Sequence, residues 1–429
     1  MRKTLLDAVP RLSKHQVPRC QIRKRVSIVQ FLSPFALIAV VGTLCLVRAN
    51  ADDETDATTA DTAPAGSVRL VLPPIIPAVV GLECNVYFDN VVLVPNPASW
   101  VFDCTCPRGH QQSERWTWTP TDADVGDVSL QLDVRDGQNE LIATAKTTIR
   151  VVSAQRQQDG ATSVLCIGDS LTHASVYTQR LLDLSGKQGH PKFKLVGSHW
   201  TGEPGPNRHE GYGGWTAKRF ATYYTGQARQ GSYRERGSPF LYRDDDDRLT
   251  LNFVRYCRDV NEGQLADVAT IFLGPNDIFR FTDENIEAGI DDMLAHMDTL
   301  IEMLRSQSPS TMIAVMLPVP PAATQDAFGS NYRSGQTRWQ YKRNQHRLVE
   351  RMLKSYAGRE SERIHIVPTY VNLDCRHNYP TTTVPANAAN DTKITRQSNS
   401  VHPSAPGYTQ IGDTLFAWLV AVGKHLPVD

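Results

Sequence analysis

The chain has 429 residues, of which 41% are hydrophobic, and a mean hydropathy of −0.34, which excludes a protein with many membrane spans. Its 45 lysines and arginines balance 45 aspartates and glutamates, so no basic excess favours nucleic-acid binding. This length allows two or more domains with sizeable cores.

The first 51 residues have the order of a secretory signal peptide. Basic residues are spread over residues 2–25, an apolar run occupies residues 35–47, and a small-x-small site (Ala-Asn-Ala, residues 49–51) precedes acidic residues. We therefore expect residues 1–51 to be removed and the protein to be secreted or periplasmic. The alternative is a retained N-terminal membrane anchor, because the stretch from Val26 to Val47 approaches spanning length. Residues 52–66 contain almost nothing apolar and are predicted to be a flexible linker.

Removal of the leader leaves six of the eight cysteines, and sequence alone cannot choose among the pairings that six allow. A disulfide from Cys84 to Cys104 or Cys106 is one expectation for an exported protein. Cys166 lies in an apolar run and is expected to be a buried small side chain.

Residues 67–154 are predicted to form a small all-β sandwich domain. Apolar residues alternate with polar ones over residues 128–134, a turn follows at residues 136–139, and a partner run occupies residues 145–151. Repeated short strands of this kind indicate an antiparallel sandwich. The segment 116–134 resembles bacterial immunoglobulin- or cadherin-like modules. Its tryptophans, Trp116 and Trp118, either bind carbohydrate or, as we prefer, belong to the core of a spacer domain.

Residues 160–429 follow a different pattern, in which short apolar runs alternate with helical periodicity. Buried parallel strands are predicted at residues 164–167, 193–196, 268–273, 312–317 and 364–367. Apolar residues recur at helical spacing over residues 286–304, 348–353 and 408–422. This alternation predicts the fold class as α/β, a three-layer α/β/α doubly wound parallel sheet of flavodoxin-like type.

Four short polar motifs follow strands or precede helices in this second domain. They are Gly-Asp-Ser-Leu at residues 168–171, Glu-Gly-Tyr-Gly-Gly-Trp-Thr at 210–216, Gly-Pro-Asn-Asp at 274–277, and Val-His-Pro at 401–403. Loops at the carboxyl ends of parallel strands are where α/β folds place their ligands. In this order the four motifs resemble the conserved blocks of the GDSL or SGNH serine hydrolases, and the resemblance spans residues 163–426.

The resemblance implies a role for one residue in each block. Ser170 would attack an ester carbonyl, and His402 would take its proton and return it to the leaving alcohol. The backbone N–H groups of Ser170 and Gly214 and the side-chain amide of Asn276 would face the oxyanion. Glycine suits position 214 because backbone approaches closely where there is no Cβ.

The chain departs from the family three residues before His402, where Asn399 replaces an aspartate. Asparagine can accept a hydrogen bond from the histidine Nδ1–H through its carbonyl oxygen, but it supplies no charge. The ring could therefore be oriented by Asn399, by a main-chain carbonyl, or by another acid such as Asp374 at the end of the last strand. The remaining alternative is a catalytically inactive descendant.

The motif arrangement looks most like that of exported bacterial esterases that remove acetyl groups from carbohydrates. The loop of residues 318–336, with Pro320, Pro321, Phe328 and Tyr332, is expected to line the pocket, and Trp215 and residues 237–240 are further candidates for its lining. We expect no cofactor and no metal, a small-molecule or polysaccharide ester as substrate, and no nucleic acid or stable membrane span. The alternatives are a lipase or lysophospholipase of the same superfamily and an inactive glycan-binding or adhesion protein.

Overall fold

The computed structural model describes residues 68–155, 160–226, 232 and 234–423. The expected signal peptide (1–51) and linker (52–66) lie outside these residues. None of the helices described is both long enough and apolar enough to cross a bilayer. The described residues from position 68 onward belong to one compact unit, and the division of that unit into two domains at residues 154–160 stays a prediction.

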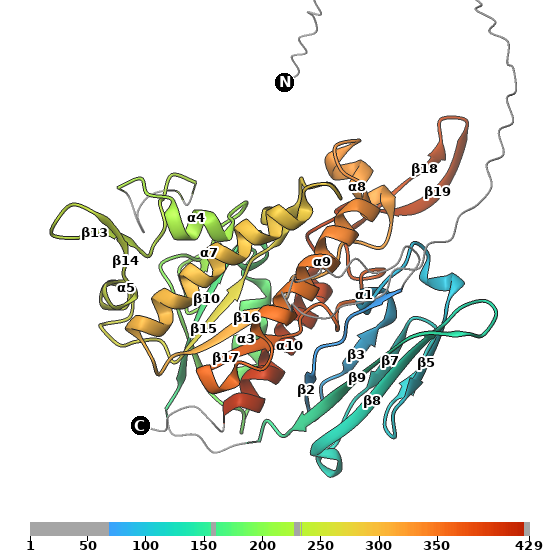
Figure 1. Ribbon diagram of the computed structural model, residues 1–429, viewed down its shortest axis with the longest axis horizontal. Helices are drawn as coiled ribbons and strands as arrows, with labels where there is room; N and C mark the ends of the chain where they lie inside the picture. The colour runs from blue at the N-terminus through green and yellow to red at the C-terminus, as the bar shows by residue number, and fades with distance from the viewer. Residues whose placement is uncertain (1–67, 156–159, 227–231, 233, 424–429) are drawn as a thin grey trace, which may run out of the picture. The chain divides into compact units, whose positions relative to one another are not determined.

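Residues 69–152 are built of short strands, as the alternating pattern predicts (Figure 1). Leu130, Leu132 and Val134 are fully buried on one face of the long hairpin. The strands are β1 (Arg69–Leu70), β2 (Ile75–Val79), β3 (Cys84–Tyr87), β4 (Val92–Leu93), β5 (Val101–Thr105), β6 (His110–Gln111), β7 (Arg115–Trp118), β8 (Gly126–Arg135) and β9 (Leu141–Val152), with the one-turn helix α1 at Phe88–Val91.

Two expectations for this β-rich region are wrong. The sheet β2-β9-β8-β5 is not purely antiparallel, because β2 runs parallel to β9. No disulfide forms, since the six cysteines of the described residues are all unpaired. The expectation of core tryptophans is confirmed, with Trp116 only 1% exposed. Whether the region is immunoglobulin- or cadherin-like stays a prediction.

The second part of the unit is the predicted parallel sheet. Its order is β11-β10-β15-β16-β17, and the short β12 also pairs with the end of β10. Two hairpins lie outside the sheet. The strands are β10 (Thr162–Gly168), β11 (Phe193–Val196), β12 (Glu210–Gly211), β13 (Leu241–Arg243), β14 (Leu249–Leu251), β15 (Val268–Phe272), β16 (Met312–Met316), β17 (Ile364–Val367), β18 (Thr381–Asn387) and β19 (Asn390–Gln397).

Helices cover both faces of this sheet. They are α2 (Ser170–His173), α3 (Val176–Ser185), α4 (Ala217–Thr222), α5 (Phe253–Val260), α6 (Pro275–Ile278), α7 (Ile286–Gln307), α8 (Gln325–Tyr332), α9 (Arg338–Tyr356) and α10 (Ala405–Val422). Successive residues of a strand point to opposite faces. Val164 of β10 accordingly belongs to the core that contains α3 and α10, and Leu165 to the core that contains α7 and α9. The three-layer α/β/α fold class is confirmed.

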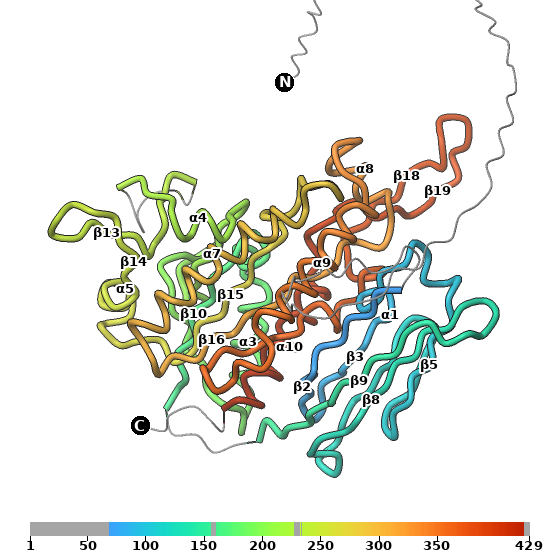
Figure 2. Tube along the Cα trace, in the orientation of Figure 1, coloured from blue at the N-terminus to red at the C-terminus, as the bar shows by residue number. Residues whose placement is uncertain are grey.

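The topology brings the carboxyl ends of β10, β12 and β15 together. Figure 2 shows the traces of β10 and β15 side by side, although about a hundred residues separate them in the chain, and their register pairs Gly168 with Phe272. The loops that follow these strands therefore meet at one edge of the sheet, where the four motifs lie.

Candidate active site

Ser170 begins helix α2 directly after the buried strand β10. Asp169 caps this helix, because its Oδ1 accepts the backbone N–H of Leu171 at 2.9 Å. Position 168 has no room for a side chain, because a Cβ there would lie 2.0 Å from Thr172 Oγ1. The Gly-Asp-Ser sequence thus turns the chain from strand to helix within two residues and leaves the serine hydroxyl at the sheet edge.

His402 lies beside this hydroxyl. Its Nε2 is 2.8 Å from Ser170 Oγ, although 232 residues separate the two in the chain. Burial lowers the pKa of His402 below its ordinary value of 6.5. The imidazole is therefore neutral near pH 7 and can accept the serine proton at Nε2, with its own proton on Nδ1.

Asn399 does not make the expected contact with the imidazole. Its Oδ1 accepts the backbone N–H of Val401 at 3.2 Å and of His402 at 3.0 Å, so it fixes the backbone that carries the ring. Within the described part of the chain we find no acceptor for His402 Nδ1. Asp374 is not a replacement, because its Oδ2 lies 2.9 Å from Nδ1 of another histidine, His377.

Two residues of the cavity have backbone N–H groups without a hydrogen-bond partner among the described residues. No described residue accepts the N–H of Ser170 or of Gly214, and both residues line the cavity at the sheet edge. Glycine at position 214 also has a conformational reason. A Cβ there would meet nothing within 4 Å, but the residue has φ of +78°, a conformation that disfavours other residues.

The Asn276 amide is already engaged. Its Nδ2 donates to Asp169 Oδ2 and to the backbone oxygen of Trp215, both at 3.1 Å. The amide thereby ties together the loops after β10, β12 and β15. Donation to an oxyanion would require one of these two hydrogen bonds to be shared or exchanged.

Two buried carboxyl groups lie close to the Asn276 amide. Asp169 accepts a hydrogen bond from it, and Asp277 is the next residue in the chain. Asp169 is fully buried, and burial raises its pKa to about 7. Burial, assisted by the neighbouring Asp169, also raises the pKa of Asp277 to about 7. Asp277 Oδ1 accepts the N–H of Ala217 at 2.9 Å, whereas its Oδ2 is buried without a partner. The two carboxyl groups are therefore largely protonated below neutral pH.

A cavity of about 750 Å³ contains the predicted residues Ser170, Gly214, Asn276 and His402. Asn399 does not line it. The remaining lining residues are Pro275, Phe279, Arg280, Tyr332, Gly335 and Val401.

The expected pocket loop contributes only in part. Tyr332 and Gly335 line the cavity, whereas Phe328 is fully buried elsewhere, and neither Pro320 nor Pro321 reaches it. Trp215 and Phe240 are also buried and do not line it. Sequence reasoning missed Phe279 and Arg280, which follow Asn276 by three and four residues. Their position in the same loop after β15 was the available signal.

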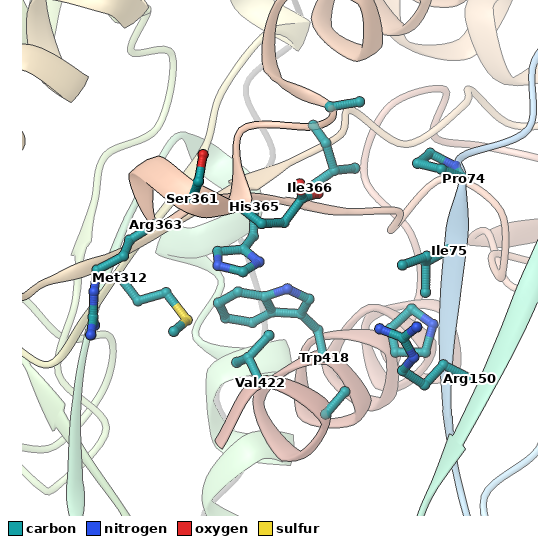
Figure 3. Close-up of a pocket in the computed structure, with 14 residues that line it drawn as sticks. Pro74, Ile75, Arg150, Met312, Ser361, Arg363, His365, Ile366, Trp418 and Val422 are labelled. Atoms are coloured by element: carbon teal, nitrogen blue, oxygen red, sulfur yellow. The ribbon is translucent and has the colours of Figure 1, made fainter. Parts of the chain in front are cut away.

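A second cavity, of about 540 Å³, contains none of the predicted residues. Figure 3 shows it near the amino ends of β16 and β17, where the rings of His365 and Trp418 lie together across from Ile75 and Arg150. Ser361 also lines it.

Comparison with solved structures finds carbohydrate esterases at low similarity. A carbohydrate esterase family 3 protein from Talaromyces cellulolyticus is 15% identical with a TM-score of 0.36, over 62% of this chain and 100% of that one. A family 3 carbohydrate esterase from Clostridium thermocellum is 17% identical with a TM-score of 0.36, over 62% and 98%. A carbohydrate acetylesterase from Sinorhizobium meliloti is 15% identical with a TM-score of 0.33, over 61% and 99%. No curated protein sequence matches the chain.

One family model covers more than half of the chain. The model of the GDSL-like lipase/acylhydrolase family matches residues 166–410, which contain all four motifs and the cavity that they surround. The protein is therefore a member of the GDSL-like lipase/acylhydrolase family.

Proposed function

We propose that this protein hydrolyses short acyl esters, and acetyl esters of carbohydrates in particular. The observation that carries the proposal is the 2.8 Å contact between Ser170 Oγ and His402 Nε2, made in a cavity that two unpaired backbone N–H groups also face. A hydroxyl that donates to a neutral imidazole is the usual arrangement of an activated serine nucleophile.

The chemistry follows from this geometry. Ser170 Oγ bonds to the ester carbonyl carbon while its proton moves to His402 Nε2. The charge that develops on the carbonyl oxygen is stabilised by the N–H groups of Ser170 and Gly214. His402 then returns the proton to the leaving alcohol. A water molecule, deprotonated by the same nitrogen, releases the acid and regenerates the serine.

We propose carbohydrate esters as substrates because of the residues that line the cavity and the arrangement of the four sequence motifs. Asn276, Arg280 and Tyr332 bring hydrogen-bonding side chains to the same cavity as the nucleophile, which suits an alcohol rich in hydroxyl groups. We also propose that the protein acts outside the cytoplasm, as a secreted or periplasmic enzyme. The basic and apolar leader with its Ala-Asn-Ala site supports this.

The first experiment measures release of 4-nitrophenol from 4-nitrophenyl acetate. We expect hydrolysis by the wild-type protein and a loss of at least about 10³-fold in Ser170→Ala, because the nucleophile is removed. The matched control is Ser361→Ala in the second cavity, which should keep the wild-type rate. Equal rates for wild type and Ser170→Ala would refute the proposal.

The same assay separates the alternatives. A lipase or lysophospholipase would prefer 4-nitrophenyl esters of eight or more carbons over acetate, whereas the proposed enzyme prefers acetate and releases acetic acid from acetylated oligosaccharides. An inactive glycan-binding protein would hydrolyse neither series. The intact hydrogen bond between Ser170 and His402 favours an active enzyme over this last alternative.

A further inference from the structure

The cavity that holds Ser170 has an unbalanced charge. Its lining contains one arginine, Arg280, and no carboxylate. Arg280 is exposed, and no described residue forms an ion pair or hydrogen bond with it. The nearest acids in the sequence, Asp277 and Asp283, are engaged elsewhere, with the backbone of Ala217 and with Arg343 and Arg347 respectively. A cation at the nucleophile is thus left without a counter-ion.

The backbone that carries Arg280 is held on both sides. Asn344 Nδ2 donates to the carbonyl oxygens of Ile278 at 3.1 Å and of Phe281 at 2.8 Å. Gln336 Nε2 donates to the carbonyl oxygen of Phe279 at 2.5 Å. Asn344 is fully buried and Gln336 is 8% exposed, so both amides belong to the interior. A fixed backbone holds the base of the Arg280 side chain beside the cavity, so less backbone entropy is lost when a ligand binds there.

Two aromatic residues line the same cavity as Arg280. The Phe279 ring lies 4.4 Å from the Tyr332 ring, centroid to centroid, and both residues line the cavity. An apolar surface beside a single unpaired guanidinium suits a ligand with a ring or short chain and one anionic group. Arginine binds carboxylates through two parallel N–H donors.

We propose that Arg280 selects esters that carry a carboxylate near the scissile bond. This inference rests on the ester hydrolysis proposed above and adds a substrate class to it. The carboxylate could belong to the alcohol, as in an O-acetylated uronic acid, or to the acyl group, as in a dicarboxylic acid monoester. Both place an anion against the Arg280 guanidinium while the ester carbonyl lies at Ser170.

The experiment compares acidic and neutral esters of matched shape. The alcohol arm uses the methyl glycosides of O-acetylated galacturonic acid and O-acetylated galactose. The acyl arm uses mono(4-nitrophenyl) glutarate and 4-nitrophenyl butyrate. In at least one arm we expect kcat/KM to be about five-fold or more higher for the acidic ester, as for a single charge-assisted contact. Raising the salt concentration should reduce the preference.

Variants assign the preference to Arg280. The ratio of acidic to neutral kcat/KM should fall towards one in Arg280→Gln, stay above one in Arg280→Lys, and fall below one in Arg280→Glu. A merely structural role would change both rates together and leave the ratio unaltered. The control is Lys393→Gln on the hairpin strand β19, which removes the same charge from an exposed residue that does not line the cavity and should leave both rates unchanged.

Two results would overturn the inference. One is a ratio near one for wild type in both arms, and the other is an acidic preference that persists in Arg280→Gln. Hydrolysis of the neutral esters tests the proposed function separately, because it is measured in the same assay and does not depend on the ratio.

Discussion

Asn399 is the residue in which this site departs from a Ser-His-Asp arrangement. Its side chain accepts two backbone N–H groups and leaves His402 Nδ1 without a described acceptor. In the mechanism proposed above, no carboxylate of the described residues contacts the imidazolium of His402. In a serine protease triad, loss of that charge lowers kcat by about 10⁴.

We predict that Asn399→Asp raises activity and moves the pH profile. The two N–H groups can hold a carboxylate as well as an amide, so the new charge lies close to the His402 backbone. We expect kcat/KM on 4-nitrophenyl acetate to increase at least about ten-fold. Burial lowers the pKa of His402 in the wild type, so its acid limb lies below pH 6.5, and the added carboxylate should move this limb upward.

The comparison variant is Asn387→Asp, in the turn of the β18–β19 hairpin, which adds the same charge at an exposed site. Its profile should match that of the wild type. If Asn399→Asp gave neither a higher rate nor a shifted acid limb, the absence of a carboxylate would not be what limits this enzyme.

Among single residues, sequence reasoning selected Ser170, His402, Gly214 and Asn276, and the structure brings all four to one cavity. Gly214 and Asn276 were found because they lie in recognisable motifs. Arg280 and Phe279 were missed, since they lie just after such a motif and nothing in their own sequence distinguishes them from other loop residues. The hydrogen bonds of Asn276 to Asp169 and Trp215 were also inaccessible, because three separate loops converge there.

Among the elements, β12 shows how a very short strand can be structurally important. Only Glu210 and Gly211 pair with β10, so no alternating pattern marks the strand in the sequence. It is fixed instead by side chains. Glu210 is fully buried and accepts the hydroxyl of Tyr256 and the backbone N–H of Ser198, both at 2.6 Å. The longer strands of the parallel sheet were predictable because each has at least three apolar residues among four consecutive ones.

Histidine side chains also hold strand β12 in place. His209 Nδ1 accepts the N–H of Gly211 at 3.0 Å, and its Nε2 lies 2.7 Å from Ser175 Oγ. Burial, with the nearby histidines, lowers the pKa of His209 to about 3 and of His199 to about 4. A proton on His209 Nδ1 would face the Gly211 N–H and break that contact.

We predict that acid destabilises the protein through these histidines. Between about pH 6.5 and the lowered values, the unfolded chain binds protons that the folded chain does not. The contribution of these two histidines to the free energy of unfolding should therefore decrease as pH falls below about 6.5, by roughly 1.4 kcal/mol per pH unit for each such proton. The raised pKa values of Asp169 and Asp277 act in the opposite direction below about pH 7, so the histidine contribution is read from the difference between the wild type and a His209 variant. Urea titrations at pH 7.5 and pH 5 measure the change.

His209→Asn should reduce this pH dependence, because an amide oxygen can accept the Gly211 N–H without titrating. The variant is expected to be less stable than the wild type at pH 7.5, since it loses ring packing, but to lose less stability on acidification. His110→Asn on the exposed strand β6 should leave the pH dependence as it is. An unchanged loss in His209→Asn would show that other groups are responsible.

For the whole molecule, the sequence pointed to a β-rich spacer and a separate α/β part, and the structure joins them through buried polar contacts. Asn90 Nδ2 donates to the backbone oxygens of Tyr370 and Leu373 at 2.8 and 2.7 Å. Asn85 donates to Asn372 Oδ1 through its backbone N–H at 3.0 Å. Sequence patterns report burial of apolar faces and cannot reveal such pairings, because the partners lie 280 or more residues apart.

Helix α9 presents three charged residues, Arg338, Lys342 and Glu350, to the β-rich region, at spacings of four and eight residues. Arg338 and Lys342 both donate to Asp89 of helix α1, and Glu350 accepts from Arg69 of β1 with Nε–Oε1 of 3.0 Å. The Lys342 side chain is only 2% exposed. The same helix carries Asn344, which holds the loop of Arg280. The β-rich region is therefore in contact with the helix that shapes the cavity.

We predict that Asp89→Ala strongly destabilises the full chain, by about 3–5 kcal/mol in urea unfolding, because it leaves the buried Lys342 ammonium without a counter-charge. The surface pair Asp103–Arg135 is the control, with side chains 55% and 28% exposed. Its loss in Asp103→Ala should cost at most about 1 kcal/mol. Adding Lys342→Met to Asp89→Ala should recover much of the stability, because the unpaired charge is then removed and its apolar stem is retained. If Asp89→Ala cost no more than Asp103→Ala, the β-rich region would not depend on this contact, and its association with the α/β part would have to rest on the amide contacts of Asn85 and Asn90.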